Sequence, residues 1–227
     1  MEVNKGYLWD SSNPLGYGNR MGVYKTTRVV DFVKRHITGV TNKILDMGGG
    51  SGRIALPLIN DGFSNYTLID LDNDAIQLCQ QKGISNAICT RIESFNQTGF
   101  DIVLAIELFI ITSPDDVLKQ ANKKLCDGGI LIFTGTNKSS WRYWLHNQRR
   151  KTTKNLGEYT LVEYQQLIAN NGFSIMRIEG YNWMPFRVNS DTVLIRVFAR
   201  IERMFFLRYW LKQSPYLLFA CTKEKTI

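Results

Sequence analysis

The feature that most constrains the fold is a glycine-rich turn that separates a short apolar run from a helical pattern. Residues 43–58 read KILDMGGGSGRIALPL. The apolar start predicts a buried strand, and the residues after the glycines predict a helix. Glycine lets the backbone turn sharply and approach a ligand closely, while the first N–H groups of the helix have no partner within it. The segment therefore predicts the first strand, turn and helix of an open α/β sheet, with a ligand at the turn.

The spacing of the glycines narrows the choice of ligand. A dinucleotide-binding G-x-G-x-x-G begun at Gly48 requires glycine at position 53, where the chain has arginine, and a start at Gly49 fails at Ser51. The phosphate-binding loop G-x-x-x-x-G-K-[ST] does not occur in the sequence. The spacing that does occur is D-x-G-x-G-x-G, from Asp46 to Gly52. An acid just before the glycines suits a cationic ligand better than a pyrophosphate.

This spacing resembles the first motif of the class I S-adenosylmethionine-dependent methyltransferases. The resemblance implies that Asp46 faces the methionine portion of S-adenosyl-L-methionine, the cofactor that transfer converts to S-adenosyl-L-homocysteine. It also implies that this cofactor lies against the backbone of Gly48, Gly50 and Gly52.

The predicted second strand, residues 66–70 (YTLID), ends in an acid. Two adjacent ribose hydroxyls are best held by one carboxylate that accepts a hydrogen bond from each, so Asp70 is the predicted ribose ligand. Leu71 is then expected to lie against the adenine. Asp72 and Asp74 open the next helix, where negative charge is favourable, and we expect them to cap that helix rather than contact a ligand.

The third predicted strand, residues 86–92, is followed by a turn that borders the adenine in the resembling family. The resemblance therefore assigns Ile92 and Glu93 to the adenine contact. The family pattern has an acid shortly before this turn, and the chain has Arg91 there.

The fourth predicted strand, residues 100–106 (FDIVLAI), has the apolar interior expected of a parallel strand covered on both faces. The longer string FDIVLAIELF resembles the fourth motif of the family, in which the end of the strand delivers side chains beside the sulfonium. Ile106 and Glu107 are the residues that stand at that end.

Strands and helices alternate between residues 44 and 134, as in a doubly wound sheet with ligands at the carboxyl ends of its strands. Segments 173–181 and 215–222 are predicted to add two strands, and the resemblance inserts the last one antiparallel between its neighbours. We therefore predict a single α/β domain with a doubly wound, mostly parallel seven-stranded sheet and an antiparallel last strand. An N-terminal helical arm precedes this sheet, and a helical insertion precedes the last strand.

The predicted division of the chain is an arm over 1–40, which caps the cofactor, and a methyltransferase domain over 41–227. Within the domain, 138–160 and 187–213 are expected to bind the acceptor or to form a lid. Residues 20–36 are predicted as the helix of the arm.

Tyr17 and Arg20 are the candidates in the arm for contact with the cofactor, together with Tyr7 and Trp9. Arms in the resembling family often close over the cofactor. Packing of the same side chains on the edge of the domain agrees with the sequence at least as well.

Composition excludes several classes of protein. The 227 residues are 44% hydrophobic and 21% charged, which is ordinary for a globular protein. The four cysteines form no C-x-x-C pair and have no close histidine, which argues against a zinc site, so no metal is expected. The N-terminus lacks the apolar core of a signal peptide, and no apolar run is long enough to cross a membrane, so we expect a cytoplasmic protein. The net charge of +8 favours an anionic partner, such as nucleic acid, a phospholipid surface or a phosphorylated glycan.

Two basic segments are candidates for contact with such a partner. Residues 139–154 combine aromatic rings that can stack on a sugar or base with arginines that can meet phosphate, but a solvated helix with its aromatics in the core fits equally well. Residues 189–212 are predicted as a long helix with an arginine stripe and an unusually apolar remainder. We expect this helix to form a lid over the sheet, with peripheral contact to a membrane as the alternative.

Methyl transfer from a sulfonium mainly requires an acceptor lone pair aligned opposite the departing sulfur. A hydroxyl acceptor also benefits from a general base, for which Glu107 and His146 are the candidates. Ordering the amine of the cofactor is the other role open to Glu107.

Three functions follow from these residues. The first is a methyltransferase that acts on a small-molecule, glycan or lipid-type acceptor at oxygen. The second is an RNA methyltransferase, which the positive charge favours, although residues 106–109 (IELF) differ from the Asn/Asp-Pro-Pro-aromatic motif of enzymes that methylate base amines. The third is a non-catalytic binding subunit with the same fold, which the intact cofactor motif opposes.

Overall fold

The sheet has the order β3-β2-β1-β4-β5-β8-β7, and the short strand β6 pairs in parallel with β5. The computed structural model describes residues 10–14, 16–37, 39–147, 157–187 and 189–225. Its strands are β1 (Ile44–Met47), β2 (Tyr66–Asp70), β3 (Ala87–Cys89), β4 (Phe100–Ala105), β5 (Leu125–Asn137), β6 (Glu158–Tyr159), β7 (Phe173–Tyr181) and β8 (Tyr216–Lys223).

The predicted topology is confirmed. Strands β1 to β5 run parallel, and β8 lies antiparallel between β5 and β7. Helices connect and cover these strands: α1 (Arg20–His36), α2 (Ala55–Asn60), α3 (Asn73–Gln81), α4 (Pro114–Lys124), α5 (Trp141–Asn147), α6 (Leu161–Asn170) and α7 (Leu194–Met204).

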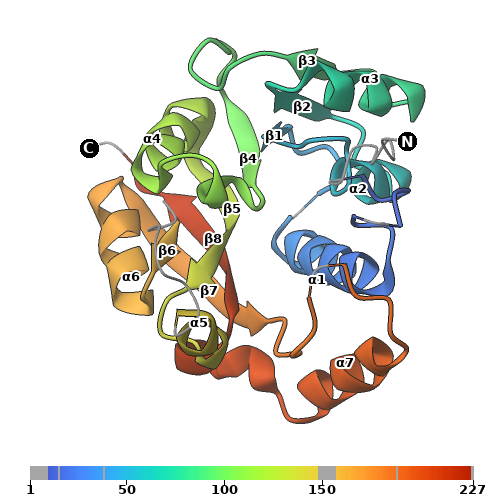
Figure 1. Cartoon of the computed structure of the whole chain (residues 1–227). Helices are drawn as coiled ribbons and strands as arrows, with labels where there is room; N and C mark the ends of the chain where they lie inside the picture. The colour runs from blue at the N-terminus through green and yellow to red at the C-terminus, as the bar shows by residue number, and fades with distance from the viewer. Residues whose placement is uncertain (1–9, 15, 38, 148–156, 188, 226–227) are drawn as a thin grey trace.

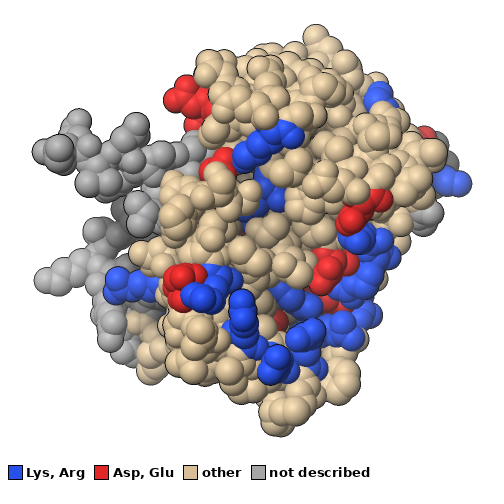
Figure 2. All heavy atoms as spheres, turned by 90° about the vertical axis from the view of Figure 1, so that its right-hand side faces the viewer, with Lys and Arg blue, Asp and Glu red and all other residues tan. Residues whose placement is uncertain are grey.

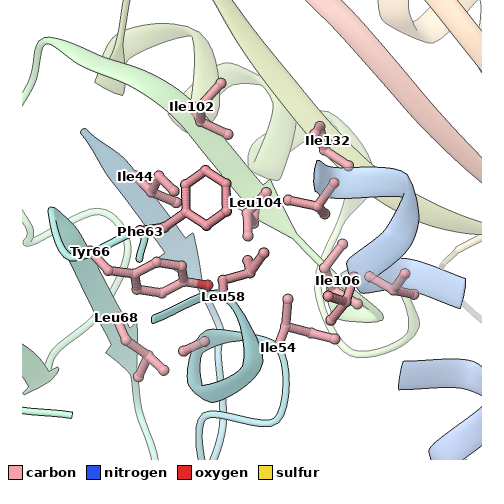
Figure 3. Close-up of a cluster of buried hydrophobic side chains, with 14 of the residues drawn as sticks. Ile44, Ile54, Leu58, Phe63, Tyr66, Leu68, Ile102, Leu104, Ile106 and Ile132 are labelled. Carbon is pink, nitrogen blue, oxygen red and sulfur yellow. The ribbon is translucent and has the colours of Figure 1, made fainter. Parts of the chain in front are cut away.

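Two helical layers cover the two faces of the sheet (Figure 1). Alternate residues of β1 and β4 point to opposite faces, as the pleat of a strand requires. Ile44 and Leu104 pack with residues of α1, α2 and α3, whereas Leu45 and Val103 pack with residues of α4 and α6. Figure 3 shows part of the first of these cores, including Ile44 of β1, Leu104 of β4 and Ile54 just before α2. Because both faces are buried, the carboxyl edge of the sheet is what remains open for a ligand.

Side-chain caps set the beginnings of several helices. Asn19 accepts a hydrogen bond from the backbone N–H of Gly22 at the start of α1, and Thr160 forms a capping box with Glu163 at the start of α6. Asp72 accepts from two backbone N–H groups at the start of α3. The capping role predicted for Asp72 is therefore confirmed.

Strand β3 ends at Cys89, three residues before its predicted end, and the bounds of two further elements differ more from those that the sequence predicts. The sequence C-D-G-G at 126–129 predicts a turn before the fifth strand, because glycine supplies unusual backbone angles, but β5 already begins at Leu125 and continues through these residues. Gly128 has a positive φ of +75°, and the pairing of β4 with β5 changes register here, so the glycine accommodates an irregularity within the strand.

The second difference concerns the long helix expected over 189–212. Helix α7 spans only Leu194–Met204, and the short 3₁₀ turns η2 (Leu207–Tyr209) and η3 (Leu211–Gln213) follow it. Phe206 ends the helix because its φ of 51° is left-handed. The aromatic residues after Met204 are weak helix formers, so intrinsic helix propensity does not extend the helix beyond this point. No helix among the described residues is both long and apolar enough to cross a membrane.

Candidate functional site

A cavity of about 330 Å³ opens at the carboxyl ends of β1, β2 and β4. Such a volume lies at the lower end of the range for small-molecule sites. The cavity is lined by Asp46, Gly48, Gly49, Gly50, Arg53, Ile54, Asp70, Leu71, Asp72, Ile106, Glu107, Leu108, Ile110 and Ile111. Parallel sheets place their ligands at this edge, so the cavity lies where the sequence predicts the site.

The glycine loop is held closely against its neighbours. The backbone N–H groups of Gly48 and Gly49 both donate to the carbonyl oxygen of Ile69, at 2.9 and 3.2 Å. Gly52 has a φ of +80°, and a Cβ placed on it would lie 2.2 Å from Cδ1 of Ile84. A Cβ at position 52 would therefore require the Ile84 side chain to move, in addition to the strain of the left-handed φ, so glycine suits both the packing and the turn.

Asp46 is buried beneath the glycine loop and lines the cavity. The hydroxyl of Tyr66 donates to its Oδ2 at 2.8 Å, while its Oδ1 has no hydrogen-bond partner among the described residues. Burial raises the pKa of this carboxyl to about 7, although the hydrogen bond from Tyr66 acts in the opposite direction. A buried carboxylate oxygen without a partner is costly, so this atom fits a ligand that donates a hydrogen bond.

Asp70 stands at the end of β2 and orders the rim of the cavity. Its Oδ2 accepts from the backbone N–H of Gly50 at 2.8 Å, and its Oδ1 accepts from that of Asp72 at 2.9 Å. Each carboxylate oxygen has a second lone pair. The side chain is thus fixed in orientation and still able to accept hydrogen bonds from a ligand.

Glu107 is the centre of a buried group of charges at the end of β4. Its carboxylate forms ion pairs with Lys25 of α1 and with Arg53, and it accepts a hydrogen bond from the hydroxyl of Tyr17. Lys25 also donates to that hydroxyl at 2.9 Å, and the guanidinium of Arg53 lies 4.1 Å from the centre of the Tyr17 ring. The arm and the sheet edge are thereby tied together at Glu107.

The titration of these groups follows from their pairing. Burial alone would raise the pKa of Glu107, but the positive charges of Lys25 and Arg53 outweigh it and lower the pKa to about 2. Burial opposes the charged form of Lys25, yet the Glu107 carboxylate raises the pKa of that ammonium well above its usual value. Burial and the charge of Glu107 together raise the pKa of Tyr17 to about 12. Glu107 therefore remains ionised at neutral pH and holds little affinity for an additional proton.

Three side chains that fix the two acids of the site were not predicted to be functional: Lys25, Arg53 and Tyr66. Lys25 carried a usable signal, because it lies four and seven residues before Val29 and Phe32 on the buried face of α1. A lysine on such a stripe requires a buried partner. No local sequence pattern indicated a role for Tyr66, because its hydroxyl reaches Asp46 only through the pairing of β1 with β2.

The predicted site residues fall into two groups. The cavity is lined by most of them: Asp46, Gly48, Gly50, Asp70, Leu71, Ile106 and Glu107. The other predicted residues lie away from the cavity or reach it only through another side chain. Gly52 lies behind the loop against α3, and Tyr17 reaches the site through its bond to Glu107.

Arg20, Ile92 and Glu93 do not line this cavity either. The Arg20 guanidinium pairs with Asp191 at 2.7 Å and lines a different cavity, between α1 and α7. Ile92 packs against the core on the α4 side of the sheet, and Glu93 is exposed. The side chain of His146 lies outside the described part of the chain, as do Tyr7 and Trp9. The described residues contain no group of three or more His, Cys, Asp or Glu side chains placed to hold a metal ion.

Comparison with known proteins finds a family match over part of the chain. A family model described as a methyltransferase domain matches residues 45–133. A ubiquinone biosynthesis O-methyltransferase of Chromobacterium violaceum is 21% identical over 187 residues, which cover 73% of this chain and 80% of that protein. The human EEF1A lysine methyltransferase 2 is 30% identical over 134 residues, which cover 51% of this chain and 56% of that protein.

The fold also matches solved structures. The magnesium protoporphyrin IX methyltransferase of Synechocystis PCC 6803, solved with bound SAH (S-adenosylhomocysteine), has a TM-score of 0.62 at 13% identity, over 90% of this chain and 85% of that one. The matched family segment contains the glycine loop, Asp70 and Glu107, which are the residues that build the cavity. Residues 45–133 therefore form a methyltransferase domain, and the chain has the fold of the class I S-adenosylmethionine-dependent methyltransferases.

Proposed function

We propose that the enzyme transfers the methyl group of S-adenosylmethionine to a hydroxyl oxygen of a small-molecule, glycan or lipid-type acceptor that has an apolar part next to that oxygen. The observation that carries this proposal is the apolar rim of the cavity. Ile110 and Ile111 line the cavity and are exposed, in the turn directly after Glu107. A cavity of about 330 Å³ has room for one small ligand. An acceptor then has to approach past these two side chains.

The cofactor residues keep the roles that the sequence gives them, as part of the proposal. Asp70 accepts hydrogen bonds from the ribose hydroxyls, because both of its oxygens are oriented and retain lone pairs. The unpartnered Oδ1 of Asp46 accepts from the donor group of the methionine portion. Leu71 and Ile106 supply apolar surface on either side, and S-adenosylmethionine itself supplies a methyl group activated by the sulfonium.

Glu107 has a positioning role rather than that of a general base. With a pKa of about 2, its carboxylate is a poor proton acceptor at neutral pH. Its ion pairs instead hold Lys25 and Arg53 beside the cavity and close the arm onto the sheet edge. His146 is the remaining candidate for the base that removes the acceptor proton.

Relatives support an oxygen acceptor over the alternatives. The relative named as an O-methyltransferase aligns over 73% of this chain, whereas the lysine methyltransferase aligns over 51%. RNA is less favoured because residues 106–109 lack the base-amine motif and because Ile110 and Ile111 offer no charge to phosphate.

The predicted arm over 1–40 and the segments 138–160 and 187–213 remain proposals as cap, acceptor-binding segment and lid. The arm is supported as a cap by the hydrogen bond from Tyr17 to Glu107 and by the ion pair between Lys25 and Glu107. In the second segment, Arg142 donates to the carbonyl oxygens of Met184 and Phe186, so α5 is anchored to the region that precedes α7.

The experiment is methyl transfer from isotope-labelled S-adenosylmethionine to three acceptor pools: hydroxylated small molecules and lipids, proteins, and RNA. Mass spectrometry of the labelled product identifies the methylated atom. The proposal predicts label on oxygen in the first pool. Label on a lysine of the protein pool, or in RNA at salt concentrations that suppress non-specific binding, would contradict it.

A further inference from the structure

Helix α7 presents three different surfaces along its length. Its buried side contains Ile195 and Glu202, which face α1. A second side carries the large apolar residues Leu194, Val197 and Ile201, all exposed. Their spacing of three and four residues places them on one face of a helix. A third side, next to the second, carries arginines at positions 196, 200 and 203.

The exposed apolar surface continues beyond the helix. Nine of the eighteen exposed large apolar side chains among the described residues lie within the eighteen-residue segment 193–210. They are Val193, Leu194, Val197, Ile201, Met204, Phe205, Phe206, Tyr209 and Trp210. We call this set the apolar ridge. Apolar surface concentrated in this way marks an interaction site rather than ordinary exposure.

The turn after α7 holds its aromatic residues outward at a cost. Phe206 adopts a left-handed φ of 51°, which is unfavourable for a bulky side chain. Its ring stacks on that of Tyr209, with centroids 6.5 Å apart, yet 60% of Phe206 and 63% of Trp210 remain exposed. Burial in the folded chain therefore does not explain why phenylalanine rather than glycine occupies position 206.

The charge beside the apolar ridge is positive. Arg196, Arg200 and Arg203 form no ion pair with an acid among the described residues. Arg196 and Arg203 also line a cavity of about 520 Å³ between α1 and α7, together with Arg20 and Arg28. The acids in that cavity include Asp191, paired with Arg20, and the buried Glu202.

Figure 2 views the face that contains α1 and α7, and its lower half is crowded with lysine and arginine side chains around a hollow. Arg196 and Arg203 of α7 line the cavity between α1 and α7, together with Arg20 and Arg28 of α1. An anionic partner is thus complementary to it in charge.

We propose that the apolar ridge and the arginine side of α7 dock the enzyme on the surface of an anionic phospholipid bilayer. An amphipathic helix that lies in the plane of a membrane buries its apolar side at the level of the acyl chains and places its arginines among the phosphates. Tyr209 and Trp210 then lie at the depth that such aromatic rings prefer. This docking is independent of which acceptor is methylated.

Two other occupants fit the same face less well. A symmetric dimer places the same patch of each copy against the other, which would bring the arginines of both α7 helices together. Nucleic acid matches the arginines but gives no reason for nine exposed apolar side chains beside them. Only an anionic lipid surface combines the two chemistries at this spacing.

The test is sedimentation of the full chain with vesicles of phosphatidylcholine alone and of phosphatidylcholine mixed with phosphatidylglycerol. We expect binding to the anionic vesicles and little to the neutral ones. Combined replacement of Arg196→Gln, Arg200→Gln and Arg203→Gln should lower the partition coefficient by about fivefold per arginine, or about 100-fold in total. Combined replacement of Met204→Ser, Phe205→Ser and Trp210→Ser should lower it by at least about tenfold, because each side chain loses buried apolar area.

Matched controls separate this face from net charge and general hydrophobicity. Replacement of three lysines elsewhere by glutamine, at Lys119, Lys123 and Lys225, removes the same charge but should leave binding within about twofold. The exposed apolar side chains Val162 and Met176, replaced by serine, should also have little effect. Circular dichroism and the affinity for S-adenosylhomocysteine check that each variant is folded.

Four results would overturn the proposal. They are no binding of the parent chain to anionic vesicles, equal losses in the lysine and arginine variants, full binding by the apolar variant, and a dimer in ultracentrifugation that the apolar variant dissolves. RNA binding that depends on the arginines but not on the apolar ridge, without vesicle binding, would assign the face to nucleic acid instead.

Discussion

Two buried acids dominate the site at the scale of single residues, and their environments push their pKa values in opposite directions. Burial with one hydrogen bond from Tyr66 raises the pKa of Asp46 to about 7, whereas two cations lower that of Glu107 to about 2. Near neutral pH the carboxyl of Asp46 can therefore be protonated or ionised, and a ligand that donates a hydrogen bond favours the ionised form, whereas Glu107 keeps its charge and organises its neighbours. An acidic side chain therefore serves ligand binding at position 46 and holds neighbouring side chains in place at position 107.

The first prediction is that affinity for S-adenosylhomocysteine depends on pH through Asp46. A donor bound to Oδ1 favours the ionised carboxylate, so affinity should be constant above about pH 7 and fall by up to about tenfold per unit below it. Calorimetric titration over this range measures the slope. Asp46→Asn should bind more weakly and show no slope in the same window, and a slope that persists in this variant would assign the titration to another group.

The second prediction concerns Glu107→Gln, which leaves Lys25 and Arg53 buried without their shared counter-charge. Loss of one partner from a buried ion pair typically costs about 3–5 kcal/mol, and we expect a decrease of this size in the free energy of unfolding. Denaturant unfolding measures it, with the exposed Glu93→Gln as the control that should change little. A decrease below about 1 kcal/mol would mean that the charges of this group are not coupled.

The same pair determines how stability responds to acid. Because the folded pKa of Glu107 is about 2 and the ordinary value is 4.5, its contribution is fully present above about pH 4.5. This contribution is lost as the pH falls toward 2. The parent chain should therefore lose stability over that window by more than Glu107→Gln does.

At the scale of elements, the glycine loop and the turn after α7 both depend on left-handed backbone. In the loop, glycine satisfies the requirement at Gly52, where packing also leaves no room for a Cβ. After α7, Phe206 adopts a similar conformation with a large exposed side chain. The first element is built for close packing, and the second gives up stability to present an aromatic ring.

The third prediction compares Gly52→Ala with Gly83→Ala. Both positions have a φ near +80°, at +80° and +84°, but a Cβ meets Ile84 at the first and nothing within 4 Å at the second. Both variants should lose about 1–2 kcal/mol from the left-handed conformation. Gly52→Ala should lose about 1–3 kcal/mol more from overpacking and should also bind S-adenosylhomocysteine more weakly. Equal effects in the two variants would show that the packing of the loop is unimportant.

The fourth prediction is that Phe206→Gly raises the free energy of unfolding by about 1 kcal/mol, since glycine adopts this φ without strain. The same change should reduce binding to anionic vesicles. Thermal unfolding and vesicle sedimentation test the two parts separately, and a less stable variant would mean that the ring contributes packing after all.

At the scale of the whole molecule, the sheet was predictable because its central strands are buried on both faces. Apolar runs such as residues 102–106 (IVLAI) predict a parallel strand, and the carboxyl ends of such strands fix where a site lies. Asp46 and Asp70 could be placed by that rule alone. The irregularity at Gly128 and the end of α7 at Phe206 could not, because both depend on tertiary contacts and on local backbone strain rather than on periodicity.

The charged group around Glu107 joins segments that are distant in sequence, from Tyr17 to Arg53 to the end of β4. Nothing in the local pattern at any one of these positions predicts the others. The helix of the arm was predicted, but the bond of Tyr17 to Glu107 was not, and Arg20 lines a different cavity from the one at the carboxyl edge of the sheet.

The central claim is that the cavity at the carboxyl edge of the sheet holds S-adenosylmethionine through Asp70. Calorimetric titration of S-adenosylhomocysteine into the parent chain, Asp70→Ala and the exposed control Asp127→Ala tests it most directly. We expect measurable binding by the parent chain and no change in Asp127→Ala. The affinity of Asp70→Ala should be lower by about 10- to 100-fold, because this variant loses hydrogen bonds to a charged acceptor. Unchanged affinity in a folded Asp70→Ala variant would contradict it.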